Sequence, residues 1–148
     1  MTWRDDTIAD IRLAEGCRLV AYQDGEGVWT IGYGHTAGVK PGDTCSQDEA
    51  EGWLVQDVNV AYGDLISHVP WFAGAPDAVK RGLLNMCFNL GWPRLSGFKA
   101  TLLSGSIGDY ASMADEALNS KWATQVGGRA DQIAALFRSC ANGGGSNV

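Results

Sequence analysis

The hydrophobic positions at the start of the chain repeat with a helical period. Ile8, Ile11 and Ala14 fall three residues apart, and acidic residues gather early in the segment, where the helix dipole favours negative charge. Gly16 then supplies a stop signal. The pattern predicts a helix over residues 3–15, with Glu15 at its C-terminal end. A carboxylate is electrostatically disfavoured there, so Glu15 is a poor choice for a purely structural role.

The pattern changes to strands after this helix. Apolar and β-branched residues at 19–22 and 28–31 flank a glycine-rich turn, which is typical of a β-hairpin. Residues 36–45 contain Gly38, Pro41 and Gly42 and are predicted to form a loop.

Helical periodicity returns at Ser46, where Ser46 to Glu49 matches a capping box. A helix is predicted from there to about residue 66, and at about 1.5 Å per residue it would be roughly 30 Å long, enough to join two lobes. Pro76 and Gly91 are start and stop signals for the next helix. Shorter helices fit residues 97–104, 109–119 and 128–138, and residues 141–148 are predicted to form a flexible tail.

These elements predict an α+β fold, mainly α, in a single domain over residues 1–148. A small β-hairpin lobe would occupy about 16–50, and a linking helix about 47–66. A helical C-terminal lobe would occupy about 67–140, with the helix at 3–15 packed on it. A substrate groove is expected between the lobes.

Composition narrows the classes of function. The chain has 148 residues, 45% of them hydrophobic, and a net charge of −6. The acidic balance argues against nucleic acid and anionic membranes as partners. No window approaches 18 continuous apolar residues, and the first residues do not resemble a signal peptide. We therefore expect synthesis in a cytoplasm, no membrane insertion and no nucleic-acid partner.

The cysteines do not suggest a metal site. Cys17, Cys45, Cys87 and Cys140 include no CxxC pair, and the chain has 2 histidines. Four cysteines allow three disulfide pairings, among which the sequence does not choose, and cytoplasmic synthesis favours free thiols. We expect no bound metal and no cofactor.

Glu15, Asp24 and Thr30 are the candidate catalytic residues. Glu15 ends a helix, Asp24 lies at the hairpin turn, and Thr30 lies on the returning strand, so it can come back near Asp24. Two carboxylates and a hydroxyl suit glycoside hydrolysis, in which one acid protonates the leaving oxygen and the other carboxylate activates water. Most Glu and Asp side chains are exposed to solvent, so a random pair of acidic residues would be interpreted as surface residues rather than as catalytic ones.

The full motif favours catalysis. Glu15 to Asp24 reads Glu-Gly-Cys-Arg-Leu-Val-Ala-Tyr-Gln-Asp, and Trp29 to Thr36 reads Trp-Thr-Ile-Gly-Tyr-Gly-His-Thr. This closely resembles the signature of phage-type lysozymes of glycoside hydrolase family 24, the relatives of T-even phage lysozyme. In these, a catalytic Glu, eight residues, a catalytic Asp, five residues and a Thr follow in this order. The resemblance extends over nearly the whole chain.

The resemblance implies a lysozyme-like two-lobed fold and a role for each residue of the motif. Glu15 would be the general acid, Asp24 would orient or deprotonate the attacking water, and Thr30 would hold that water. Positions matching the family's sugar groove are Tyr22, Thr36, Phe88, Asn89 and Thr101. Aromatic residues among them could equally belong to the core. Arg129 could pair with Glu15 across the lobes, as the family suggests, or be a solvated residue at a helix start.

Two further residues have competing interpretations. His35 could act in catalysis, but a structural role, for example a contact with Asp57, is favoured because the resemblance gives His35 no chemical role. Cys17 and His35 together could suggest a Cys–His amidase. Cys17 lies near a helix end, which does not lower the pKa of a thiol as a helix start does, so this alternative is disfavoured.

The sequence therefore predicts an endolysin-type muramidase. It would cleave the β-1,4 bond between N-acetylmuramic acid and N-acetylglucosamine in peptidoglycan, with inversion, for lysis of a bacterial host. The expected partner is the peptidoglycan glycan strand, the expected state is a monomer, and release through a holin-type pore is expected. The alternatives are a lytic transglycosylase, which the presence of Asp24 and Thr30 disfavours, and a non-catalytic peptidoglycan-binding lysozyme-like domain.

Overall fold

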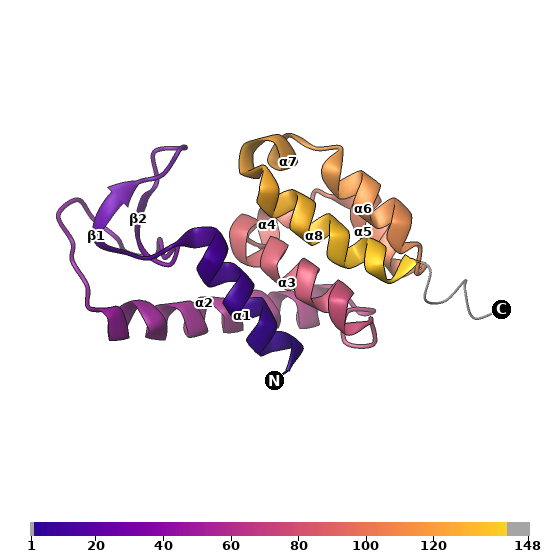
Figure 1. Ribbon diagram of the computed structural model, residues 1–148, viewed down its shortest axis with the longest axis horizontal. Helices are drawn as coiled ribbons and strands as arrows, with labels where there is room; N and C mark the ends of the chain where they lie inside the picture. The colour runs from indigo at the N-terminus through magenta and orange to yellow at the C-terminus, as the bar shows by residue number, and fades with distance from the viewer. Residues whose placement is uncertain (1, 142–148) are drawn as a thin grey trace. The chain divides into compact units, whose positions relative to one another are not determined.

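The computed structural model describes residues 2–141 (Figure 1). Within that range the chain forms eight α-helices and a two-stranded antiparallel sheet, which confirms the predicted mainly-α, α+β class. Apart from Ala141, the predicted flexible tail at 141–148 lies outside the described residues. Within residues 2–141, no helix has the length and apolar character that crossing a membrane requires.

The elements occur in the order α1 (Trp3–Glu15), β1 (Arg18–Gln23), β2 (Trp29–Gly32), α2 (Gln47–His68), α3 (Asp77–Leu90), α4 (Trp92–Leu95), α5 (Lys99–Ser106), α6 (Tyr110–Leu118), α7 (Lys121–Val126) and α8 (Gly128–Ser139). The predicted helices at 3–15, 47–66, 109–119 and 128–138 are confirmed within two residues at each end. The capping box is also formed: the Ser46 amide donates to Glu49 Oε1 at 2.9 Å, and the Glu49 amide donates to Ser46 Oγ at 3.1 Å.

Two short helices were not predicted from the sequence. α4 has four residues and α7 has six, and both are too short to show a hydrophobic period. Their local signals are nonetheless present. Pro93 lies in the first turn of α4, and the Ser120 side chain caps α7 by accepting a hydrogen bond from the Ala123 amide at 3.1 Å.

The chain divides into two compact units. The first, here called the hairpin unit, is Ile8–Val60 and holds most of α1, the sheet and the first part of α2. The second, here called the helical unit, comprises the described residues before and after it. The buried side chains of the hairpin unit include Ile11, Ile31, Ala50, Leu54 and Val58, each at most 1% exposed. They come from α1, β2 and α2, so these three elements share one core.

The sheet of the hairpin unit is extended by part of the predicted loop. β1 pairs with β2 in the register Tyr22 with Thr30, and the pairing is irregular between Arg18 and Tyr22. Past the loop, the Cys45 amide donates to the Leu19 carbonyl at 2.9 Å, and an isolated bridge joins Val20 and Thr44. The chain therefore returns along β1 before it enters α2.

The helical unit is built around α3 and α8. α8 packs on α3 and on α6, and α6 also packs on α5 (Figure 1). Its largest fully buried side chains are Phe72, Phe137, Leu65, Leu83, Leu84, Met86, Leu95, Met113 and Ile133. The start of α1 is held in this unit by aromatic contacts, since the Trp3 ring lies 5.9 Å from Phe72 and 6.1 Å from Tyr62.

Candidate active site

Glu15 is the last residue of α1, and the backbone directs the chain away from the helix immediately after it. Gly16 has φ +65°, and its amide closes the final turn by donating to the Arg12 carbonyl at 2.9 Å. The Glu15 side chain is partly buried. Its carboxylate lies against the backbone of Gly34, because a Cβ atom built on Gly34 would be 2.6 Å from Glu15 Oε1.

Asp24 is anchored to the hairpin turn by one of its two carboxylate oxygens. Oδ1 accepts hydrogen bonds from the amides of Glu26 at 2.8 Å and Val28 at 2.9 Å. This is the local bonding that makes Asp a turn residue. The two bonds fix the orientation of the carboxylate. Its other oxygen, Oδ2, takes part in neither of them.

Thr30 lies on β2, opposite Tyr22 of β1, and is 3% exposed. Its Oγ1 donates a hydrogen bond to the Val28 carbonyl at 2.9 Å. The hydroxyl hydrogen is therefore already used. What Thr30 can offer to another molecule is its oxygen lone pairs, as an acceptor.

Tyr22 feels the charges of two of the candidate catalytic residues, Glu15 and Asp24. Burial raises the pKa of the Tyr22 hydroxyl, the negative charge of Glu15 raises it further, and Asp24 adds to the effect against the opposing charge of Arg18. The Arg18 guanidinium lies 4.3 Å from the centre of the Tyr22 ring. The hairpin unit therefore brings both Glu15 and Asp24 within electrostatic reach of Tyr22, whereas Thr36 lies exposed after the hairpin.

His35 has the structural contact that the sequence suggested. Its Nδ1 lies 2.7 Å from Asp57 Oδ2, and its ring stacks on Trp53 with the ring centres 4.6 Å apart. The Cys17 thiol instead donates to Gln47 Oε1 at 3.7 Å. Because Cys17 and His35 are engaged with different partners, the geometry does not favour the Cys–His alternative.

We expect the His35–Asp57 contact to stabilise the fold rather than to serve the chemistry. Asp57→Ala should lower the free energy of unfolding by about 1–3 kcal/mol, because a largely buried imidazole loses its partner. Asp57→Asn keeps a neutral hydrogen-bond acceptor, so its free energy of unfolding should fall by less. Denaturant unfolding followed by circular dichroism measures both variants. Equal stability of Asp57→Ala and the unchanged protein would contradict this assignment.

In the helical unit, α3 carries three polar or aromatic residues toward its end. Asn89 Oδ1 accepts a hydrogen bond from Trp122 Nε1 at 2.7 Å, and so ties α3 to α7. Asn85 is fully buried, and its Oδ1 accepts from Arg129 Nε at 3.0 Å. Phe88 is half-buried. Asn85 was missed by sequence reasoning, although a polar residue within a run of buried apolar positions of α3 was a usable signal.

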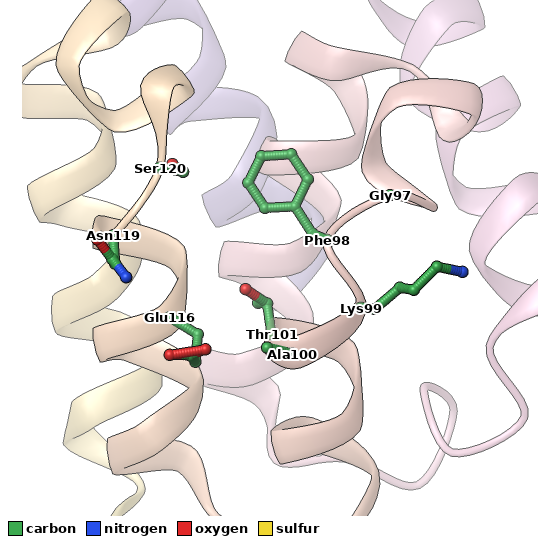
Figure 2. A pocket seen from close by; sticks show the side chains of 8 residues that line it. All are labelled: Gly97, Phe98, Lys99, Ala100, Thr101, Glu116, Asn119 and Ser120. Atoms are coloured by element: carbon green, nitrogen blue, oxygen red, sulfur yellow. The ribbon is translucent and has the colours of Figure 1, made fainter.

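Thr101 lies in a pocket of about 260 Å³. Its lining residues are Gly97, Phe98, Lys99, Ala100, Thr101, Glu116, Asn119 and Ser120. Figure 2 shows the Thr101 hydroxyl directed toward the side on which Glu116 and Asn119 lie, while Lys99 extends away from it. Thr101 is 2% exposed. The pocket thus combines an aromatic ring with hydroxyl, carboxylate and amide groups, a mixture suited to a polar ligand.

The chain is similar to known lysozymes and endolysins over most of its length. A family model described as phage lysozyme matches residues 12–140, a span that includes Glu15, Asp24 and Thr30. An endolysin of Acyrthosiphon pisum secondary endosymbiont phage 1 is 33% identical over 132 residues, covering 86% of this chain and 85% of that protein. A protein of Dictyostelium discoideum named probable T4-type lysozyme 2 is 26% identical over 157 residues, covering 87% of this chain and 91% of that protein.

Proposed function

Because this chain belongs to the phage lysozyme family and is therefore a lysozyme-type glycoside hydrolase, we propose that it hydrolyses one specific bond of peptidoglycan. That bond is the β-1,4 linkage between N-acetylmuramic acid and N-acetylglucosamine, and cleavage proceeds with inversion. The observation that carries this proposal is the bonding of Asp24 and Thr30. Both side chains are held in place by the hairpin and keep acceptor oxygens for a water molecule.

The proposed reaction follows from these acceptors. The attacking water donates one hydrogen to Asp24 Oδ2 and the other to Thr30 Oγ1, whose own hydrogen goes to the Val28 carbonyl. A lone pair of the water is then free to form the bond to the anomeric carbon. Protonated Glu15 gives its proton to the leaving oxygen as the glycosidic bond breaks, and Asp24 takes the proton that the water loses. Attack from the face opposite the leaving group inverts the anomeric centre.

The first test is mass spectrometry of soluble fragments released from purified peptidoglycan. Reducing N-acetylmuramic acid ends are expected, and NMR of the first-formed anomer should show inversion. Anhydro ends would instead assign the protein to the lytic transglycosylases. Binding to peptidoglycan without soluble fragments would identify a non-catalytic domain, and full loss of activity on thiol alkylation would revive the Cys–His alternative.

Substrate contacts are proposed for six residues: Tyr22, Thr36, Phe88, Asn89, Thr101 and Arg129. Support is strongest for Thr101, whose hydroxyl faces a polar pocket. Asn89 and Arg129 already make hydrogen bonds within the helical unit, to Trp122 and Asn85, which would hold them in fixed orientations. The pairing of Arg129 with Glu15 remains a prediction, and unchanged activity and stability of Arg129→Ala would dismiss it.

Replacement of Thr101 by Val should weaken substrate binding. The methyl group preserves the shape of the side chain but removes the hydroxyl, so we expect KM to rise about two- to tenfold with little change in kcat. Thr124→Val, at an exposed position of α7, is the matched control and should leave KM unchanged. An unaltered KM in Thr101→Val would remove Thr101 from the proposed substrate contacts.

We also propose that the protein acts as a monomer in host lysis. It would be made in the host cytoplasm and reach the wall through a holin-type pore. Expression in a bacterial host with and without a holin tests this route. Lysis that requires the holin supports it, whereas equal lysis without the holin contradicts it.

A further inference from the structure

The contact between Glu15 and Gly34 is closer than any side chain at position 34 would allow. A Cβ atom at Gly34 would lie 2.6 Å from Glu15 Oε1, 2.7 Å from Cδ and 3.1 Å from Oε2. Ordinary van der Waals contact with a Cβ atom begins at about 3.4 Å. Gly34 also has φ +73°, a region that glycine tolerates best. Position 34 therefore favours glycine for two separate reasons: its backbone conformation and its contact with the Glu15 carboxylate.

Gly38 provides the comparison within the same chain. Its φ of +70° is nearly that of Gly34, but a Cβ atom there would meet nothing within 4 Å. A substitution at Gly38 thus carries the same backbone strain without the contact. The difference between the two positions isolates the effect of the Glu15 carboxylate.

The backbone on the Gly34 side of this contact is braced and cannot easily withdraw. Ile31 and His35 exchange two backbone hydrogen bonds of 2.9 Å each, which close the turn that contains Gly34. The His35 ring is held by Trp53 and Asp57 of α2. On the other side of the contact is the end of a flexible side chain. If position 34 gained a Cβ atom, the carboxylate of Glu15 would be the group to move.

We propose that Gly34 is a positioning residue for Glu15, whose carboxyl group rests on the bare backbone of Gly34 and is held there for proton transfer. This inference rests on the proposed role of Glu15 as general acid. Relief of the overlap requires a shift of about 1 Å. Misplacement of a catalytic group by that amount can cost about 10²-fold in rate.

The kinetic test compares Gly34→Ala with Gly38→Ala. We expect kcat on purified peptidoglycan to fall about 10²-fold in Gly34→Ala with KM little changed. In Gly38→Ala both constants should stay close to those of the unchanged enzyme. Equal kcat in the two variants, at equal folded fraction, would overturn the proposal.

A stability cycle tests the contact without using activity. The loss of melting temperature caused by Gly34→Ala should be larger in the unchanged protein than in a Glu15→Ala background, where the carboxylate is absent. The loss caused by Gly38→Ala should be the same in both backgrounds. Equal losses for Gly34→Ala in the two backgrounds would overturn the proposal.

The cycle also covers a variant that does not fold. If Gly34→Ala alone is unfolded but Glu15→Ala/Gly34→Ala folds, the contact is supported. If both are unfolded while Gly38→Ala folds, position 34 needs glycine for another reason and the proposal fails. If the unchanged protein releases no muropeptides, the proposed function fails. The stability cycle does not use activity, so it still tests the contact between Gly34 and Glu15.

Discussion

Glu15→Gln is expected to lower the rate of muropeptide release by about 10²- to 10⁴-fold, the range that general acid–base catalysis contributes. The amide cannot donate a proton of the required acidity to the leaving oxygen. Its size matches that of the carboxyl group, so the close approach to Gly34 is retained. Melting temperature should change little. Mass spectrometry of fragments from purified peptidoglycan measures the loss.

The matched control for this variant is Glu26→Gln. Glu26 is an exposed residue of the hairpin turn, and it is the backbone amide of Glu26 that bonds Asp24, which the substitution leaves in place. Its activity should stay within about twofold of the unchanged enzyme, as expected for a surface substitution. Substantial activity in Glu15→Gln would show that another group supplies the proton and would remove Glu15 from its proposed role.

The sequence predicts the long elements of this fold because their signals are local and redundant. α2 has a capping box at its start, and Ala50, Leu54 and Val58 recur on the face that is buried. α4 and α7 escape prediction because four to six residues cannot display a period. The return of residues 43–45 along β1 also escapes, because it depends on backbone hydrogen bonds to a distant segment rather than on a side-chain pattern.

The candidate site also has one part that the sequence predicts and another part that it does not. Glu15, Asp24 and Thr30 fall within sixteen consecutive residues, and their order and spacing are properties of the sequence itself. The environment of each residue is a property of the folded chain. Neither the Arg129–Asn85 bond nor the Gly34–Glu15 contact can be derived from periodicity, since both join residues by tertiary packing. Gly34 belongs to the motif, but the motif does not reveal which atom of another residue lies against it.

Substitutions of Asp24 should separate a loss of activity from a loss of stability more clearly than substitutions of any other residue of the site. Its Oδ1 accepts two backbone hydrogen bonds, and an asparagine carbonyl oxygen can accept both. Asp24→Asn should therefore keep the turn and the melting temperature. It removes the carboxylate that we propose takes the proton of the attacking water, so we expect activity to fall by about 10²- to 10⁴-fold.

Asp24→Ala removes the charge and both acceptor interactions. We expect the same loss of activity together with a loss of about 1–3 kcal/mol in the free energy of unfolding, at about 0.5–1.5 kcal/mol for each hydrogen bond. Denaturant unfolding and muropeptide release, measured on both variants, separate the two effects. If Asp24→Asn were as active as the unchanged enzyme while Asp24→Ala was unstable, Asp24 would be a turn residue, and the water would have to be activated by another group. Inactivity of both variants with stability lost only in Asp24→Ala would mean that one oxygen of Asp24 maintains the hairpin while the charge of its carboxylate serves the reaction.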